Sequence, residues 1–419
     1  MTFLDRYIHT AGVTFTPPAF HRWACLSLVA AALADRVWIE KLKKHVYPNL
    51  YVMLVGPSGC GKGEALDMMM KLASGIPSLM ERILRGGLTK QRLLDILGGR
   101  STKREKGEAV VSEAKANTAP WIIYPELYNS LGAGGPVAEA FIANLTDLYT
   151  GSPVPMTEGT RTWGDVVIEK YTLNWCSGTT ESWLKKSLSP EAILSGFFGR
   201  TVTITGTYQD EWIEAVFPQN YNDLWRLLTG QLEQICQMAG PIALSPEAQH
   251  IRVQWMRSRE VPTDPFLRPM YQRDDDLFLK LCMVLAACDL SYTVTRDHAL
   301  RARDLVRERW APGAALVRVA QSKPESDQLE TIGSYIRQAG RMDHSTLVHK
   351  CSGRGIMAKT VNSVIDTLTQ GGRVTMDVVG RKRWYQWQAG RPMAAVDVQP
   401  EVELAAAEPQ PADLHPQTS

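Results

Sequence analysis

The sequence predicts an α/β fold, and three features of the chain support that class. An apolar, β-prone run at 50–55 passes through a glycine-rich turn into a helix-forming stretch at 64–72. Two more apolar runs of strand length follow at 121–124 and 171–176. Helical patterns stand between and after these runs, so strands alternate with helices as they do in α/β proteins.

The glycine-rich turn fits the pattern G-x-x-x-x-G-K, which binds nucleotide phosphates. Its glycines let backbone amides turn inward, and the helix that follows presents its positive N-terminus. Lys62 adds a point charge that reaches the β- and γ-phosphates. We therefore predict a P-loop NTPase core whose ATP-binding residues are Gly56, Pro57, Ser58, Gly59, Cys60, Gly61, Lys62 and Gly63.

Gly63 departs from the usual pattern, which supplies a Ser or Thr hydroxyl to Mg²⁺ at this position. Water can replace that hydroxyl, because Mg²⁺ keeps several waters readily. The departure also fits weak hydrolysis or a purely structural nucleotide site. The expected cofactors are ATP and Mg²⁺, and the protein ligands of the metal stay open.

An acidic residue, Glu126, follows the buried run at 121–124. P-loop ATPases place a second strand beside the first, with one or two carboxylates at its end. One carboxylate organises the Mg²⁺ shell and the other polarises the attacking water. Pro125 stands at the first of these positions, so Glu126 is the candidate for water activation. The alternative is an acid at the first turn of the next helix.

The run at 171–176 predicts a third buried strand, which leads into a polar stretch. A polar side chain at the end of this strand can contact the γ-phosphate and water. Asn174 and Thr179 are both candidates, and the pattern does not choose between them. Asn174 is the one taken, with Glu126, as a catalytic candidate.

An arginine, Arg200, stands directly before the alternating, β-branched run Thr201–Thr205, which predicts another strand. An arginine at this position can project onto the nucleotide of a neighbouring subunit and stabilise developing charge. The alternative is a salt-bridged arginine on the surface.

Helical segments surround the predicted core. They suggest a helical N-terminal cap at 1–47, an ATPase core at 48–208 and a helical lid at 209–322. The predicted helices of the cap and lid are 3–10, 17–33, 212–238, 246–259, 274–290 and 295–309.

Two stretches within the core have the composition of nucleic-acid contacts. Residues 98–119 mix Gly, Ser and charges of both signs, which predicts a mobile surface loop or a DNA-facing one. Residues 156–167 read as a hairpin with Arg161 and Trp163 at its tip. A cation beside an aromatic ring suits a phosphate contact with base stacking, although an ordinary surface hairpin fits equally.

The C-terminal segment 326–388 reads as three helices followed by a hairpin, which is a winged-helix pattern. It holds nine basic residues against five acidic ones, so positive charge is concentrated there. The DNA-binding candidates are Lys359, Arg381, Lys382 and Arg383. Winged helices also dock proteins, so that role stays open. Residues 389–419 predict a disordered tail.

The bulk composition restricts the remaining classes. The 419 residues carry a net charge of +2, so any attraction to nucleic acid is local. Seven scattered cysteines without a C-x-x-C pair favour a reducing compartment and give no metal site. The apolar run at 23–33 is too short to cross a bilayer. We expect a cytoplasmic protein that does not bind a membrane.

This order of parts resembles the AAA+-type ATPases of phages and mobile elements, which are relatives of viral primase-helicases and minichromosome-maintenance helicases. The stretches at 21–23 and 271–273 add to the resemblance, which covers about residues 18–310. It implies that Lys62 is the phosphate lysine, Glu126 the acidic-strand glutamate and Arg200 the arginine finger. Arg273 matches the lid arginine that senses nucleotide. The resemblance also implies assembly into a ring, of hexamer type.

The expected function is that of an ATP-hydrolysing, DNA-associated motor, such as the replicative-type helicase of a phage or mobile element. Its expected partners are DNA, further copies of the chain, and a primase or other replication proteins. The alternative is a nucleotide-switched helicase loader or DNA-binding regulator without unwinding activity. A DNA-binding protein with a vestigial P-loop is a third reading.

Overall fold

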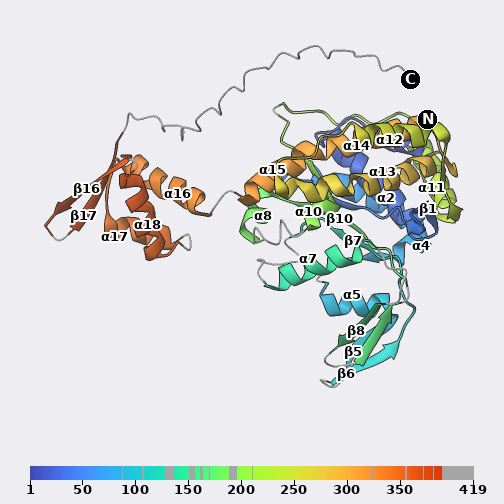
Figure 1. The fold of residues 1–419 in the computed structure, drawn as a ribbon, viewed down its shortest axis with the longest axis horizontal. Coiled ribbons are helices and arrows are strands. Elements are labelled where there is room, and N and C mark those ends of the chain that lie inside the picture. The colour runs from blue at the N-terminus through green and yellow to red at the C-terminus, as the bar shows by residue number, and fades with distance from the viewer. Residues whose placement is uncertain are drawn as a thin grey trace, which may run out of the picture. The chain divides into compact units, whose positions relative to one another are not determined.

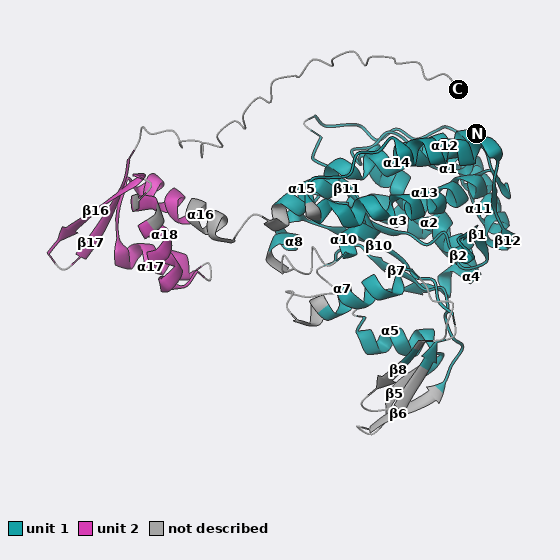
Figure 2. Ribbon diagram, viewed as in Figure 1, with its two compact units in different colours: residues 1–321 teal, residues 322–419 magenta. Residues whose placement is uncertain are grey.

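A computed structural model describes residues 1–388 except 87, 106–107, 128–135, 151–155, 161–163, 169, 188–195, 210, 322–323, 354–355, 371 and 381. The chain divides into two compact units, residues 1–321 and 322–419 (Figure 2). The predicted cap, core and lid all belong to the first unit, and the predicted winged helix belongs to the second. The predicted tail at 389–419 and residues Arg161, Trp163 and Arg381 lie outside the described residues.

A five-stranded parallel sheet forms the centre of the first unit (Figure 1). Its strand order is β11-β3-β10-β7-β4. These strands are β3 (Tyr51–Val55), β4 (Ile83–Leu84), β7 (Trp121–Tyr124), β10 (Asn174–Thr179) and β11 (Thr201–Thr205). Every residue of β3, β7 and β10 is buried, as expected for central strands covered on both faces. The α/β class predicted from the sequence is therefore correct.

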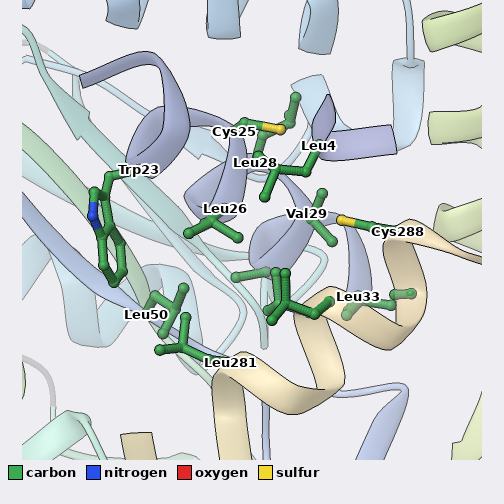
Figure 3. Packing of buried hydrophobic residues seen from close by; sticks show 14 of the residues in the cluster. Leu4, Trp23, Cys25, Leu26, Leu28, Val29, Leu33, Leu50, Leu281 and Cys288 are labelled. Atoms are coloured by element: carbon green, nitrogen blue, oxygen red, sulfur yellow. The ribbon is translucent and has the colours of Figure 1, made fainter. Parts of the chain in front are cut away.

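Helix α2 (Pro18–Leu33) is part of the core of this unit. It contacts β3, β10 and α3 (Lys62–Ser74), and every position from Trp23 to Leu33 is buried. Figure 3 shows side chains of α2 packed with Leu50 and with Leu281 and Cys288 of α13. Such burial around the whole circumference of a helix means that neighbours surround it on all sides.

Long helices follow the sheet in sequence, and four of them correspond to predicted helices. These are α11 (Tyr221–Gln237), α12 (Pro246–Arg257), α13 (Arg268–Cys288), which begins earlier than predicted, and α14 (Arg296–Glu308). A further helix, α15 (Trp310–Gln321), was not predicted. The predicted helix at 212–238 begins too early, because α11 starts only at Tyr221. The preceding stretch contains Pro218, and Val216 pairs there with Val13 in an isolated antiparallel bridge.

Two antiparallel hairpins extend the first unit. One joins β5 (Arg100–Glu105) to β6 (Glu108–Glu113), and the other joins β8 (Met156–Thr160) to β9 (Gly164–Ile168). Both contact α5 (Lys90–Leu97). The second hairpin was predicted. The first replaces the predicted loop, and its register sets Arg100 opposite Glu113.

The second unit packs three helices against a three-stranded antiparallel sheet. Its elements are α16 (Pro324–Ala339), β15 (Arg341–Asp343), α17 (His344–Ser352), α18 (Ala358–Gln370), β16 (Val374–Val379) and β17 (Lys382–Trp387). The strand order is β15-β17-β16. Its core includes Ile332, Ile336, Leu347, Val361 and Tyr385.

Shorter elements complete the described fold. They are α1 (Phe3–Ala11), β1 (Val37–Lys41), β2 (Lys44–Val46), α4 (Pro77–Met80), α7 (Pro136–Leu148), α8 (Glu181–Ser187), α10 (Phe197–Arg200), β12 (Gly240–Pro241), β13 (Ala243–Leu244), η1 (Pro265–Leu267) and β14 (Thr293–Val294). In the described part of the chain, no helix has the length and apolarity needed to cross a bilayer.

Candidate nucleotide-binding site

The glycine-rich turn connects the end of β3 to the start of α3, as the sequence predicts. Gly59 and Gly61 have φ angles of 84° and 89°, in the left-handed region that favours glycine. A side chain at Gly61 would also collide with Thr16, which belongs to the segment before α2. Both the backbone and this neighbour therefore require glycine at position 61.

The turn leaves several backbone donors without partners. The amides of Gly59, Gly61, Lys62 and Gly63 meet no hydrogen-bond acceptor among the described residues. The last two belong to the first turn of α3, where no intrahelical acceptor exists. Gly59 and Gly63 are exposed, so their amides lie at an accessible edge, whereas Gly61 and Lys62 are buried. Unpaired amides at a helix N-terminus suit an anion such as a phosphate.

The side chain of Lys62 closes onto the turn itself. Its ammonium donates to the carbonyl oxygens of Gly56 and Pro57 at 2.7 Å each, and the residue is buried. Cys60 Sγ lies 3.8 Å away. To contact a phosphate bound at the amides, this ammonium has to leave the two neutral carbonyls. A charge-assisted contact with an anion is stronger than a hydrogen bond to a neutral carbonyl, so the exchange is favourable.

The segment that carries the predicted acid passes close to this lysine, although its strand is not the neighbour of β3. Strand β10 separates β7 from β3, so the expectation of adjacent strands was wrong. The amide of Leu127 donates to the carbonyl of Gly178 at 2.8 Å. A Cβ on Gly178 would touch the Pro125 carbonyl and lie 3.6 Å from Lys62 Cβ. Glu126 is exposed within this small group of segments.

Asn174 lies at the opposite end of β10 from the turn. Its Oδ1 accepts from the Leu50 amide at 3.0 Å, before β3 begins. Thr179, in contrast, pairs in register with Val55 at the end of β3. Asn174 and Thr179 are five residue steps apart along the strand, or roughly 16 Å at about 3.3 Å per step. The choice of Asn174 for a γ-phosphate contact is therefore wrong, and Thr179 stands at the end next to the turn.

Arg200 and Arg273 also lie toward that far end of the sheet. Arg200 directly precedes Thr201, which pairs with Tyr51, the first residue of β3. Its Nη1 donates to the Gly196 carbonyl at 2.9 Å. Burial lowers the pKa of Arg200, and the nearby charge of Arg273 lowers it further. The structure thus brings these two arginines near each other and places Arg200 away from the glycine-rich turn of the same chain.

A buried polar network occupies the same far end. Lys280 donates to the backbone carbonyl of Asn49 at 3.1 Å and to its side-chain oxygen, and lies 4.3 Å from the ring centre of Tyr149. Asn49 Nδ2 donates to the carbonyls of Tyr149 and Leu173. Burial lowers the pKa of Lys280 to about 7. A lone lysine within the apolar run at 277–288 was the sequence signal for this site.

Two segments distant in sequence border the glycine-rich turn at 56–62, which we call the phosphate turn, and neither segment was predicted. Thr16 Oγ1 donates to Glu64 Oε2 in the first turn of α3 at 2.8 Å. Tyr208 donates its hydroxyl to the carbonyl of Ser58 at 2.7 Å. Tyr208 follows β11 in an irregular segment, and no local pattern marks such a long-range contact.

The predicted DNA-binding residues of the second unit are partly described. Lys359 is exposed on α18, and Lys382 and Arg383 are exposed on β17. Other basic side chains of this unit lie over aromatic rings. Arg337 is 4.4 Å from the ring centre of Trp387, and Arg341 is 5.1 Å from that of Trp384.

Within the described residues, no three His, Cys, Asp or Glu side chains are grouped so that they could hold a metal ion. No protein-family model matches the chain, and no curated protein sequence is significantly similar to it.

Proposed function

We propose that this protein is an ATP-hydrolysing, DNA-associated motor of the helicase type that works as a ring. The observation that carries the proposal is the phosphate turn. Four unpaired amides and the ammonium of Lys62 lie at the carboxyl end of a parallel sheet, beside Glu126. Ligands of α/β proteins bind at this end of the strands.

The chemistry follows from the groups at this end. The amides of the turn hold the β-phosphate, and Lys62 leaves the Gly56 and Pro57 carbonyls to contact the β- and γ-phosphates. Glu126 orients a water for in-line attack on the γ-phosphorus. A new P–O bond to the water oxygen forms while the bond to the β–γ bridging oxygen breaks. The products are ADP and inorganic phosphate.

Magnesium fits this site with few protein ligands. Gly63 brings no hydroxyl, and no atom lies within 4 Å of the position that a Cβ there would occupy. Mg²⁺ bound with the nucleotide would take phosphate oxygens and waters, a shell that this ion accepts readily. Its chemistry is to neutralise the charge of the β- and γ-phosphates.

The positions of Arg200 and Arg273 support action between subunits. Arg200 lies at the amino end of β11, roughly 16 Å along the sheet from the turn of its own chain, at about 3.3 Å per strand residue. Arg200 can contact a nucleotide only if a second copy of the chain places its own phosphate turn against this end of the sheet. We propose that Arg273 acts with it on the neighbour's phosphates, because α13, which carries Arg273, packs against α10, which ends at Arg200.

The second unit supports the DNA-binding part of the proposal. Its order of helix, strand, two helices and two strands suits a winged helix, with α18 as the recognition helix and β16–β17 as the wing. Lys359, Lys382 and Arg383 are exposed on these elements. They supply the positive charge that phosphates of a duplex require.

DNA-stimulated ATP hydrolysis tests the motor. Lys62→Ala and Glu126→Gln should each lower the hydrolysis rate by a factor of about 100 or more, since each removes a group that acts on the transferring phosphate. Trp212→Phe is a control, because this exposed aromatic residue lies outside the site. Full activity in both site variants would refute the assignment.

Gly63 favours a second candidate, a nucleotide-switched loader or regulator that binds DNA without unwinding it. A site with no metal-binding hydroxyl suits slow hydrolysis and a long-lived bound state. Strand displacement on a forked DNA separates the two functions. Displacement that depends on ATP and on Lys62 supports the motor, and ATP-dependent DNA binding without displacement supports the loader.

A further inference from the structure

Tyr208 makes an unusual contact for an exposed residue. The segment 206–208 leaves β11 and passes the phosphate turn, and the amide of Gly206 donates to Val55 at 2.9 Å. Two residues later, the hydroxyl of Tyr208 donates to the Ser58 carbonyl at 2.7 Å, although 59% of the residue is exposed.

This contact fixes one peptide plane of the turn. A trans peptide is planar, so the Ser58 carbonyl and the Gly59 amide point in opposite directions. Because the carbonyl is held toward Tyr208, the amide of Gly59 faces away from it. That amide has no acceptor among the described residues.

Little else holds this plane. Gly59 has a φ of 84° and no side chain, and a Cβ built on it would meet nothing within 4 Å. Both Ser58 and Gly59 are exposed. A glycine in such open surroundings allows its peptide to rotate at small cost, which would exchange the amide for a carbonyl that repels an anion.

We propose that Tyr208 is a positioning residue of the phosphate site: its hydroxyl holds the Ser58–Gly59 peptide so that the Gly59 amide is presented to the phosphates. The proposal rests on the function proposed for the turn. It assigns to the segment after β11 a role in preparing the cradle before nucleotide arrives.

Affinity for two ligands tests the role. Tyr208→Phe removes the hydroxyl and keeps the ring. It should weaken the binding of both Mg²⁺–ATP and inorganic triphosphate by the same factor. That factor should be about fivefold, because one hydrogen bond usually contributes about 1 kcal/mol. Trp212→Phe is the matched control in the same segment, since Trp212 is 86% exposed, and it should leave both affinities unchanged. Isothermal titration calorimetry gives the dissociation constant of each ligand. In steady-state kinetics of ATP hydrolysis, the variant should show a raised KM and a nearly unchanged kcat.

The outcomes separate the two proposals. If the wild type binds neither ligand, the phosphate site itself fails and Tyr208 loses its role with it. If the wild type binds both and Tyr208→Phe binds them equally well, only the role of Tyr208 is overturned. A loss confined to ATP also overturns it, because the hydroxyl would then serve the nucleoside and not the peptide of the turn.

A spectroscopic readout observes the peptide directly. Labelling serine carbonyl carbons with ¹³C and glycine nitrogens with ¹⁵N selects the five Ser–Gly pairs of the sequence, which include Ser58–Gly59. Inorganic triphosphate should shift the Gly59 amide signal strongly in the wild type. In Tyr208→Phe the signal should be displaced or broadened before ligand is added. An unchanged Gly59 signal in the variant contradicts the proposal.

Discussion

The two ends of the central sheet treat their polar groups in opposite ways. At the carboxyl end, the phosphate turn leaves backbone amides unpaired at an exposed edge. At the amino end, Asn49 and Lys280 are buried and bound to backbone groups of the surrounding segments, and the Oδ1 of buried Asn174 accepts from the Leu50 amide. A buried network of this kind fixes the structure, whereas unpaired donors can accept an anion such as a phosphate. Polar residues that look similar in sequence therefore have different roles at the two ends.

The largest expected effect concerns the arginine at the amino end. Arg200→Ala and Lys62→Ala should each lower ATP hydrolysis about 100-fold or more, because each removes a charge that stabilises the transferred phosphate. An equal mixture of the two variants should regain part of the activity, since some junctions then combine an intact Lys62 with an intact Arg200.

This recovery is measured by comparing the ATP hydrolysis rate of the mixture with the rate of each variant alone. A mixture no more active than its components would place the action of Arg200 within its own chain or remove it from the site altogether.

Asn49→Ala should be the most destabilising change at the amino end. It removes two donated hydrogen bonds and one acceptor of Lys280 from a buried site. The free energy of unfolding should fall by about 3 kcal/mol, since each of the three lost hydrogen bonds is worth about 1 kcal/mol. Urea denaturation measures it, with Asn220→Ala as the control, because that exposed side chain makes no cap hydrogen bond.

Lys280 makes this end sensitive to pH. Its folded pKa of about 7 is below the ordinary value of 10.5, so the unfolded chain binds more protons between these two pH values. Stability contributed by Lys280 therefore rises as pH increases from about 7 toward about 10. Urea denaturation at pH 7, 8 and 9 should show a steeper rise for the wild type than for Lys280→Met. Equal slopes would mean that the lysine keeps its ordinary pKa.

The smallest expected effect is a gain at the carboxyl end. Gly63→Ser adds a hydroxyl where space is open, and it should raise ATP hydrolysis a few-fold at limiting Mg²⁺. Gly61→Ser adds the same group two residues earlier, where it meets Thr16 and a positive φ, and should abolish binding. Magnesium titrations of the rate compare the two variants. No gain in Gly63→Ser would indicate that the metal does not approach this position.

Local signals allowed much of the carboxyl end to be predicted. The strand, the glycine turn and the helix are adjacent in sequence, and each pattern supports the next. The third strand was predicted to end at 176, whereas β10 extends to Thr179. Its last residues, Ser177-Gly178-Thr179, have the polar composition of a turn. Central position in the sheet buries those residues, and only long-range pairing reveals that. Tyr208 and Thr16 were missed for the same reason.

The hairpin at 100–113 shows a related limit. Its strands contain many charged residues, so the apolar alternation that marks a half-buried strand is weak. Antiparallel pairing of the two arms supplies the order, and it sets Arg100 opposite Glu113, a pair of opposite charge.

The contact between Thr16 and Gly61 has a practical consequence. Residues before α2 form one wall of the phosphate turn, and Thr16 is also bonded to Glu64 of the helix that begins there. Trimming the first sixteen residues, or fusing a rigid partner close to Thr16, would alter the surroundings of the turn. Expression tags for biochemical work are better placed at the other terminus, beyond residue 388.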